Sequence, residues 1–225
     1  MAEETLGVAV LTYDRWDYAA RTISSLAKYL RWSSRLVVHI ADDGSADEYR
    51  QCLAHLASDA FGLPVRTSNS ERRGYGASYN LAMQQIHPQS TWVLPLEDDW
   101  ECLRLFDAEE FVRPLREGWG CVRLGYLGFL AQLRAEVLNI DGATYLHLDP
   151  TSAEHHIAAG HPRLETVRWA RAVGPWTEGL DPGSTEREWC GRPAARQRVL
   201  WPLNLRPVGD LFAHIGSIQA RADQR

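Results

Sequence analysis

The sequence predicts an α/β protein in which helices connect the strands of one sheet. Its first half alternates between apolar residues at every second position and apolar residues at helical spacing, the pattern of strand–helix–strand units. Short polar segments follow the strands, and one apolar run stops at three consecutive carboxylates, Glu97, Asp98 and Asp99. Because the strands of an open parallel sheet end at a common edge, these polar residues predict a ligand site there.

Each element of the first half is expected from its own pattern. Glycines at 74 and 76 allow a close backbone approach before one of the helices. The expected elements are, in chain order, a strand over 7–12, a helix over 19–30, a strand over 35–41, a polar helix over 47–58, a short strand around 65, a helix over 77–86 and a strand ending at 97.

The second half is less regular and is expected to extend the same sheet. A helix over 107–117 should kink or stop at Pro114, a strand is expected over 121–127, and residues 137–148 should form a hairpin that turns at Asp141-Gly142. Later segments mix histidine, arginine, tryptophan and carboxylates, a composition typical of substrate-binding loops. Since no linker or repeat is evident, we expect one domain over residues 1–225.

Composition excludes some classes of partner. The formal net charge is -5 and the pI is about 5.9, so no global field would attract nucleic acid or an anionic membrane, and any nucleic-acid contact must be local. No apolar stretch approaches the roughly 20 residues that cross a bilayer, and the acidic start is unlike a signal peptide. We therefore expect a cytoplasmic protein without a transmembrane segment. The four cysteines form no CxxC pair and are expected to be free thiols.

The three consecutive carboxylates are the most informative motif. Neighbouring negative charges repel one another and resist desolvation, so their position at the end of a core strand indicates a hard cation that binds an anionic ligand. A nucleotide diphosphate held through Mg²⁺ or Mn²⁺ is the natural candidate. The alternative is a solvated cap for a following helix, which would need one carboxylate and not three.

Several motifs, in order and spacing, resemble the family 2 glycosyltransferases of the GT-A fold, an α/β fold with a mixed sheet flanked by helices. The motifs are residues 8–15, Ala41-Asp42-Asp43-Gly44-Ser45, residues 73–80, Leu96-Glu97-Asp98-Asp99 and residues 212–216. The resemblance implies transfer of a sugar, with inversion, from a nucleotide-diphosphate donor for which UDP is expected. It also implies a nucleotide-sugar-binding half over about 1–100 and an acceptor-binding half over about 101–225. Glu97 departs from the aspartate at the start of the family's DxD-like motif.

The resemblance assigns the donor site. Asp99 and His214 would bind the metal, Asp42 and Asp43 the base and ribose, and Thr12 and Tyr13 would line the base pocket. The remaining donor-binding residues that it implies are Arg15, Arg73, Gly74, Glu97 and Asp98. Two simpler interpretations stay open, namely that His214 is an ordinary core residue and that Asp42 and Asp43 only form a polar turn before a helix.

The acceptor site is expected between residues 174 and 192. Glu186 best matches the family's catalytic base, Glu188 is a rival, and Glu178 is a weaker one; an exposed helix start is the alternative. Trp176 and Trp189 are candidates to stack on a sugar or nucleobase, although burial is the commoner use of tryptophan. Glu178 and Arg192 complete the expected acceptor-binding residues.

The acceptor itself is the least determined feature. Residues 187–206 are rich in arginine with interleaved tryptophan, a composition that suits the donor diphosphate, a phosphate backbone or a solvated face. Residues 161–164 and 186–189 resemble phage and metavirome DNA glycosyltransferases, which makes 5-hydroxymethylcytosine in DNA the leading acceptor and would place the protein in the host cytoplasm. A saccharide acceptor in polysaccharide synthesis is the main alternative. Two other classes of protein are alternatives. A nucleotidyltransferase should have a Gly-rich loop directly after its first strand. A non-catalytic nucleotide- or sugar-binding module would need no catalytic base.

Overall fold

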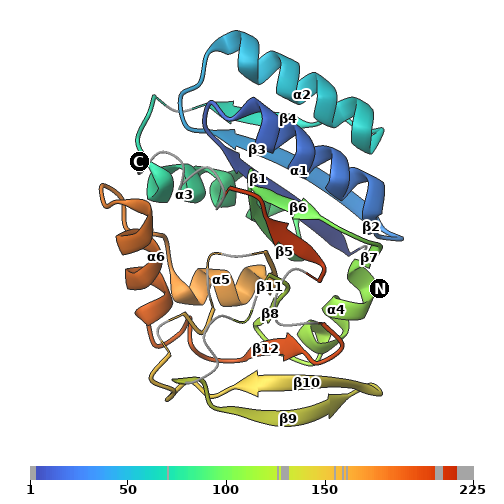
Figure 1. The fold of residues 1–225 in the computed structure, drawn as a ribbon, viewed down its shortest axis with the longest axis vertical. Coiled ribbons are helices and arrows are strands. Elements are labelled where there is room, and N and C mark those ends of the chain that lie inside the picture. The colour runs from blue at the N-terminus through green and yellow to red at the C-terminus, as the bar shows by residue number, and fades with distance from the viewer. Residues whose placement is uncertain are drawn as a thin grey trace.

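A mixed sheet of nine strands runs through the molecule (Figure 1). The computed structural model describes residues 4–69, 71–125, 127, 132–154, 156–158, 160, 162–205 and 210–216. The strands are β1 (Thr5–Thr12), β2 (Leu30–Arg31), β3 (Arg35–Asp42), β4 (Arg66–Asn69), β5 (Trp92–Glu97), β6 (Trp100–Cys102), β7 (Phe106–Asp107), β8 (Cys121–Arg123), β9 (Ala135–Ile140), β10 (Ala143–Leu148), β11 (Arg163–Thr166), β12 (Val199–Pro202) and β13 (Phe212–His214). Their order in the sheet is β4-β3-β1-β5-β11-β8-β12-β10-β9, and β13–β6 and β2–β7 form two small ribbons.

The first half of the chain builds the parallel part of the sheet. Strand β1, buried along its whole length, lies between β3 and β5 and is parallel to both. Thr12 is paired with Asp42, and Leu11 with Glu97, so the three strands end together. The chain moves outward from β1 to β3 and β4 and then returns to β5 on the other side of β1. Such a reversal opens a crevice at the carboxyl ends of the strands.

Six α-helices cover the sheet in the part of the chain that the structure describes. They are α1 (Trp16–Tyr29), α2 (Asp47–Phe61), α3 (Tyr75–Ile86), α4 (Ala108–Arg116), α5 (Val167–Val173) and α6 (Pro182–Gly191), with a short 3₁₀ helix at His87–Gln89. Helices α1 and α2 pack against each other, while α3 packs on β1 and β3. Because crossovers between parallel strands are right-handed, α3 lies on the opposite face of the sheet from α1 and α2. This arrangement confirms the predicted α/β fold with helices flanking a mixed sheet.

The second half continues the sheet with antiparallel and parallel strands. Strand β11 pairs antiparallel with β5 and β8, and the β9–β10 hairpin forms the far edge, at the bottom of Figure 1. The hairpin turns at Asp141 (φ 48°) and Gly142 (φ 78°), as predicted for an Asp-Gly turn.

Two predictions about the second half were incomplete. Strand β8 spans Cys121–Arg123, shorter than the predicted 121–127. The polar stretches 154–168 and 174–189 were expected to form loops, with a helix start near Glu186 as the alternative, but this part of the chain contains β11, α5 and α6. The side chains of Thr166 and Asp181 cap the two helices by accepting hydrogen bonds from the backbone of Trp169 and Ser184.

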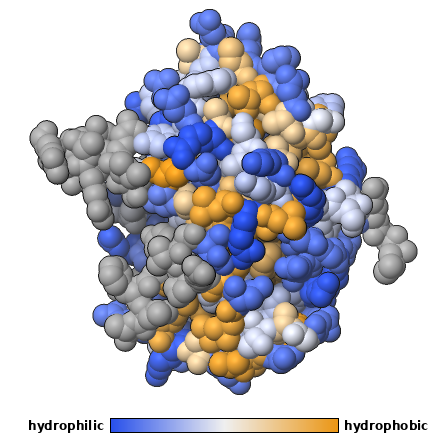
Figure 2. Space-filling model, turned by 45° about the vertical axis from the view of Figure 1, so that its right-hand side comes forward, coloured by the Kyte–Doolittle hydropathy of each residue, from blue (hydrophilic) through white to orange (hydrophobic). Residues whose placement is uncertain are grey.

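On the face shown in Figure 2, hydrophobic residues lie in small patches separated by hydrophilic ones. Among the large apolar side chains described, those of Val137 on β9 and Leu105 have the highest exposed fractions. Among the helices described, none is both long enough and apolar enough to span a bilayer.

Candidate active site

A cleft of about 690 Å³ opens at the carboxyl ends of β1 and β5, where the chain reverses direction in the sheet. One wall comes from the first half of the chain, and the other comes from the segment that begins α6. The cleft is lined by Leu11, Thr12, Tyr13, Asp14, Arg15, Asp43, Arg72, Gly74, Tyr75, Ser78, Glu97, Asp98, Asp99, Leu180, Pro182, Gly183 and Glu186. Many residues that were predicted on separate motifs therefore share one cavity.

Asp98 lies fully buried at the base of this cleft. Its Oδ2 accepts hydrogen bonds from the Thr12 hydroxyl (2.9 Å) and from Nε of Arg15 (3.3 Å), and its Oδ1 pairs with the Arg15 guanidinium. Burial raises the pKa of Asp98 to about 6, although Arg15 acts in the opposite direction. Asp98 thus anchors Arg15 at the floor of the cleft.

Asp99 and His214, the two residues predicted as metal ligands, lie side by side. Oδ2 of Asp99 is 3.4 Å from Nε2 of His214 and 3.0 Å from Nη1 of Arg15. Burial alone would raise the pKa of Asp99, but His214 and Arg15 together lower it, and Asp99 in turn raises the pKa of His214. The pairing of β13 with β6 brings His214 opposite Trp100, on whose ring it stacks.

Two observations test whether a cation fits beside Asp99. Its Oδ1 is buried and has no hydrogen-bond partner among the described residues, so a strong acceptor is left open. Gly216 lies so close that a Cβ there would be 2.2 Å from Asp99 Oδ2, which makes this approach specific to glycine. An unpaired carboxylate oxygen beside an imidazole is a suitable ligand set for a divalent cation.

Glu97 points toward helix α3 and accepts a hydrogen bond from the Tyr75 hydroxyl (2.7 Å). Burial, with Asp99 and Glu186 as charged neighbours, raises the pKa of Glu97 to about 8. The helix cap that was considered for this cluster is excluded, because β6 and not a helix follows Asp99.

Asp42 and Asp43 both shape the loops around the cleft. Asp42 accepts hydrogen bonds from the backbone of Gly44 and Ser45, so its carboxylate closes the turn after β3, and it does not line the cleft. Asp43 lines the cleft and accepts hydrogen bonds from the backbone N–H groups of Arg73 and Gly74. It therefore ties β3 to the start of α3. The polar-turn interpretation describes Asp42 well, whereas Asp43 also faces the cavity.

Tyr13 forms the rim of the cleft together with Arg72. Nη1 of Arg72 donates to the Tyr13 hydroxyl (2.9 Å), and its guanidinium lies 4.1 Å from the ring centroid. Such a pair presents a flat, positively charged surface. Arg73, by contrast, points away and forms an ion pair with Glu178.

Glu186 is the carboxylate of the opposite wall. It lines the cleft from the second turn of α6, and its Oε1 accepts a hydrogen bond from the N–H of Gly160 (2.5 Å). A Cβ on Gly160 would lie 2.9 Å from that oxygen and 3.2 Å from the Tyr75 hydroxyl. Tyr75 therefore lies between Glu97 on one wall and Glu186 on the other.

Glu188, the rival candidate for the base, lies outside this cavity. Its carboxylate accepts hydrogen bonds from Arg192 (2.8 and 3.0 Å) and from the Thr177 hydroxyl (2.6 Å). The hydrogen bond from Arg192 lowers the pKa of Glu188. Arg192 also donates to the carbonyl oxygens of Val173 and Pro175, so both residues fasten the loop that precedes α6.

Trp176 and Trp189 were expected to be available for stacking, but they stack on each other. Their ring centroids are 4.5 Å apart, the planes differ by 5°, and the exposed fractions are 4% and 1%. Arg163, itself buried and paired with Glu165, lies over Trp189. These side chains form a core under the acceptor wall, so any effect on an acceptor would be indirect.

Comparisons with known proteins address the family. The profile described as Glycosyl transferase family 2 matches residues 7–123, just over half of the chain. The chain belongs to glycosyl transferase family 2. No curated protein sequence matches the chain.

Solved structures show the GT-A fold of this family 2 chain. S. aureus TarS has a TM-score of 0.68 at 16% identity, over 93% of this chain and 36% of TarS. TarS 1-349 in complex with UDP-GlcNAc has a TM-score of 0.64 at 15% identity, over 95% of this chain and 61% of that one. GalNAc-T7 with UDP, GalNAc and Mn²⁺ has a TM-score of 0.62 at 13% identity, over 89% of this chain and 43% of GalNAc-T7. The chain thus spans between about a third and three-fifths of the length of these structures.

Some residues of the family 2 cleft were not predicted as site residues. Tyr75, Arg72 and Ser78 line it from the segment that opens α3, and Leu180, Pro182 and Gly183 line it from the start of α6. Tyr75 lies between the two glycines that were singled out, which was a usable signal. Of the residues suggested for DNA contact, His161 and Arg206 lie outside the described part of the chain. Arg196 and Arg198 donate to backbone carbonyl groups within the protein.

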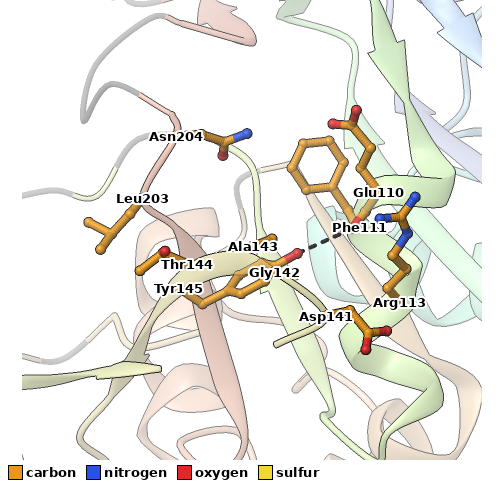
Figure 3. Close-up of a pocket in the computed structure, with 10 residues that line it drawn as sticks. All are labelled: Glu110, Phe111, Arg113, Asp141, Gly142, Ala143, Thr144, Tyr145, Leu203 and Asn204. Carbon is orange, nitrogen blue, oxygen red and sulfur yellow. Dashed lines mark hydrogen bonds between the residues drawn. The ribbon is translucent and has the colours of Figure 1, made fainter. Parts of the chain in front are cut away.

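A second cavity of about 630 Å³ lies at the far edge of the sheet, between α4 and the β9–β10 hairpin (Figure 3). Glu110 and Arg113 face it from α4, and Tyr145 from β10 donates a hydrogen bond to the carbonyl of Glu110 (3.2 Å). It does not include the carboxyl ends of the parallel strands and none of the predicted site residues line it.

Proposed function

We propose that this protein is a metal-dependent inverting glycosyltransferase that transfers a sugar from a UDP-sugar to an acceptor hydroxyl group, with 5-hydroxymethylcytosine in DNA as the leading acceptor. One observation carries the proposal: the cleft has Asp99, beside His214, on one wall and Glu186 on the other. A donor diphosphate and an acceptor hydroxyl group would meet between these walls.

Asp99 and His214 would hold the cation through Oδ1 and the imidazole. A carboxylate suits Mg²⁺ or Mn²⁺, and of these two cations Mn²⁺ accepts an imidazole ligand more readily. The bound cation would neutralise charge on the departing diphosphate. Arg15, which pairs with Asp98 and Asp99, would add a fixed positive charge beside the phosphates, since its guanidinium cannot be deprotonated.

Glu186 would act as the general base. It would take the proton from the acceptor hydroxyl, whose oxygen forms the new bond to the anomeric carbon while the bond to the diphosphate oxygen breaks on the opposite side. The hydrogen bond from Gly160 would keep the carboxylate oriented during this step. Inversion would follow, because the base and the departing diphosphate would lie on opposite walls.

The nucleotide is inferred from shared fold and family. TarS 1-349 has been solved with UDP-GlcNAc, and GalNAc-T7 with UDP, GalNAc and Mn²⁺. The stacked pair of Tyr13 and Arg72 at the rim suits a flat nucleobase next to a phosphate-binding floor. Asp43 would stay within reach of the ribose.

The DNA acceptor rests on the resemblance of residues 186–189, within α6, to DNA glycosyltransferases. This helix provides Glu186 to the cleft, so the same segment would carry both base and acceptor contacts. A target base would have to leave its stack to reach such a cleft.

A turnover assay tests the proposal. The protein, with Mn²⁺ or Mg²⁺ and a panel of UDP-sugars, is offered DNA containing 5-hydroxymethylcytosine, and both UDP and modified nucleosides are quantified by mass spectrometry. A hexose mass on the nucleoside is the expected result. UDP release without it would redirect the search to saccharide acceptors, and pyrophosphate release would indicate a nucleotidyltransferase instead.

A further inference from the structure

Three metal-ligating side chains of different chemistry converge behind the acceptor wall of the cleft. A nitrogen of His156, a carboxylate oxygen of Glu186 and the sulfur of Cys190 all lie within 4.8 Å of one another. Cys190 is fully buried, whereas His156 and Glu186 are 37% and 25% exposed. None of the sequence motifs considered above pointed to this cluster.

The geometry of the cluster follows from helix α6 and one loop. Glu186 and Cys190 are four residues apart, so their side chains lie on the same face of the helix. His156 approaches from the segment before β11, and its Nδ1 is 3.8 Å from Oε1 of Glu186. Each residue thus offers one ligand atom to a common point.

The loop that carries His156 is held by hydrogen bonds. Nη1 of Arg123 donates to the carbonyl oxygens of His156 (2.7 Å) and Ile157 (3.1 Å), and the N–H of His156 donates to Glu154 (3.0 Å). Gly160 fixes Glu186 from the same loop. The bond from Gly160 orients a ligand side chain, as supporting contacts do in natural metal sites, whereas the bonds from Arg123 fix the backbone of the loop.

We propose that His156, Glu186 and Cys190 form a binding site for Zn²⁺, separate from the hard-cation site at Asp99. Thiolate, imidazole and carboxylate are the usual zinc ligands, and three protein ligands leave a fourth position for water. Small side-chain movements would bring the three atoms to zinc-bonding distances of about 2.0–2.3 Å. Glu186 also lines the cleft, which provides an entry path.

Zinc at this site would inhibit the enzyme, because it would occupy the carboxylate that we assign as the base. This consequence, unlike the binding itself, rests on the proposed function. Burial raises the pKa of the Cys190 thiol to about 12, so zinc binding must release the thiol proton.

A Co²⁺ titration without other metals tests the site directly, since a cobalt–thiolate bond gives a charge-transfer band in the near ultraviolet. We expect this band in the unmodified protein, its loss in Cys190→Ser, and cobalt affinity at least about tenfold lower in His156→Ala. Cys102→Ser, a change at another buried thiol, and His214→Ala should keep the band. His156 is partly exposed, so its variant should fold even if Cys190→Ser does not.

Zinc inhibition, measured with saturating Mn²⁺, tests the consequence. Micromolar Zn²⁺ should inhibit the unmodified enzyme, and His156→Ala should raise the inhibitory concentration about tenfold. If the cobalt band is absent, persists in Cys190→Ser, or forms with unchanged cobalt affinity in His156→Ala, the zinc site is wrong. If the band follows the variants but zinc does not inhibit, the site stands and the role of Glu186 as base falls.

Discussion

The two walls of the cleft position their carboxylates in different ways. On the wall from the first half, Asp98 is buried and held by Thr12, the last residue of β1, and by Arg15, the residue that precedes α1. On the opposite wall, Glu186 is held by the backbone of Gly160, which belongs to a loop. A network anchored on strands is rigid, whereas one that depends on a loop is easier to vary. The comparison indicates that the ends of the strands position the donor-wall carboxylate, whereas a loop outside the sheet positions the acceptor-wall carboxylate.

The largest effect is expected at Glu186. The change Glu186→Gln keeps an oxygen for the Gly160 N–H but removes the base, so turnover should fall about 10²- to 10⁴-fold while UDP binding stays unchanged. Steady-state kinetics and calorimetry measure the two quantities. Glu188→Gln, two residues away and outside the cleft, is the matched control and should change turnover far less. Equal losses in both variants would contradict the assignment of the base.

The corresponding change on the donor wall is Asp99→Asn. It removes the charged ligand of the proposed cation site, so the affinity for UDP in Mn²⁺ should fall about 100-fold and become insensitive to EDTA. Isothermal titration calorimetry checks this. Glu101→Gln, on strand β6, which begins directly after Asp99, but paired with Arg21, should bind UDP normally. Undiminished, metal-dependent binding by Asp99→Asn would exclude its role.

A third prediction concerns the contact that joins the walls. A Cβ on Gly76 of α3 would lie 2.3 Å from the backbone oxygen of Thr177, so Gly76→Ala should lower the free energy of unfolding by about 1–3 kcal/mol. Thermal unfolding measures it. Gly191→Ala, which meets no atom within 4 Å, should stay within about 0.5 kcal/mol. If both variants unfold alike, the close approach is not a constraint.

The smallest effect is expected at Tyr75, which touches both walls. Tyr75→Phe removes the hydrogen bond to Glu97, which should cost about 0.5–1.5 kcal/mol and raise KM for the donor about 2- to 12-fold. Tyr145→Phe in the second cavity loses a comparable hydrogen bond and should leave KM unchanged. A similar change in both would mean that the effect is not local to the cleft.

The sequence predicted the donor wall better than the acceptor wall, for physical reasons. Hydrophobic periodicity locates buried strands, and the register of parallel strands then brings Thr12, Asp42 and Glu97 to one edge. Helix α6 was foreseen only as the alternative of an exposed helix start near Glu186, because its polar, Gly- and Pro-containing start resembles a loop until the cap at Asp181 is recognised.

The features of the site that the sequence did not predict depend on tertiary contacts, which no local sequence pattern encodes. The sequence around Trp176 and Trp189 is the same whether the rings face a ligand or each other. Their stacked pair packs against Tyr79 of α3, whose ring centroid is 4.3 Å from that of Trp176 and which is distant from both in sequence. In the same way, no sequence pattern singled out Gly160, although its N–H donates a hydrogen bond to the Glu186 carboxylate.

Asn80 on α3 has a consequence for how acceptor preference could diversify. Its side-chain amide accepts from the N–H of Trp176 (2.8 Å) and donates to the carbonyl oxygen of the same residue (2.9 Å), as a neighbouring strand would. These two hydrogen bonds therefore fix the backbone of residue 176 against α3, independently of the residues that follow it. Insertions or exchanges between residue 179 and the start of α6 would leave the spacing of the two walls intact, so new acceptors could be recruited by swapping that short segment alone.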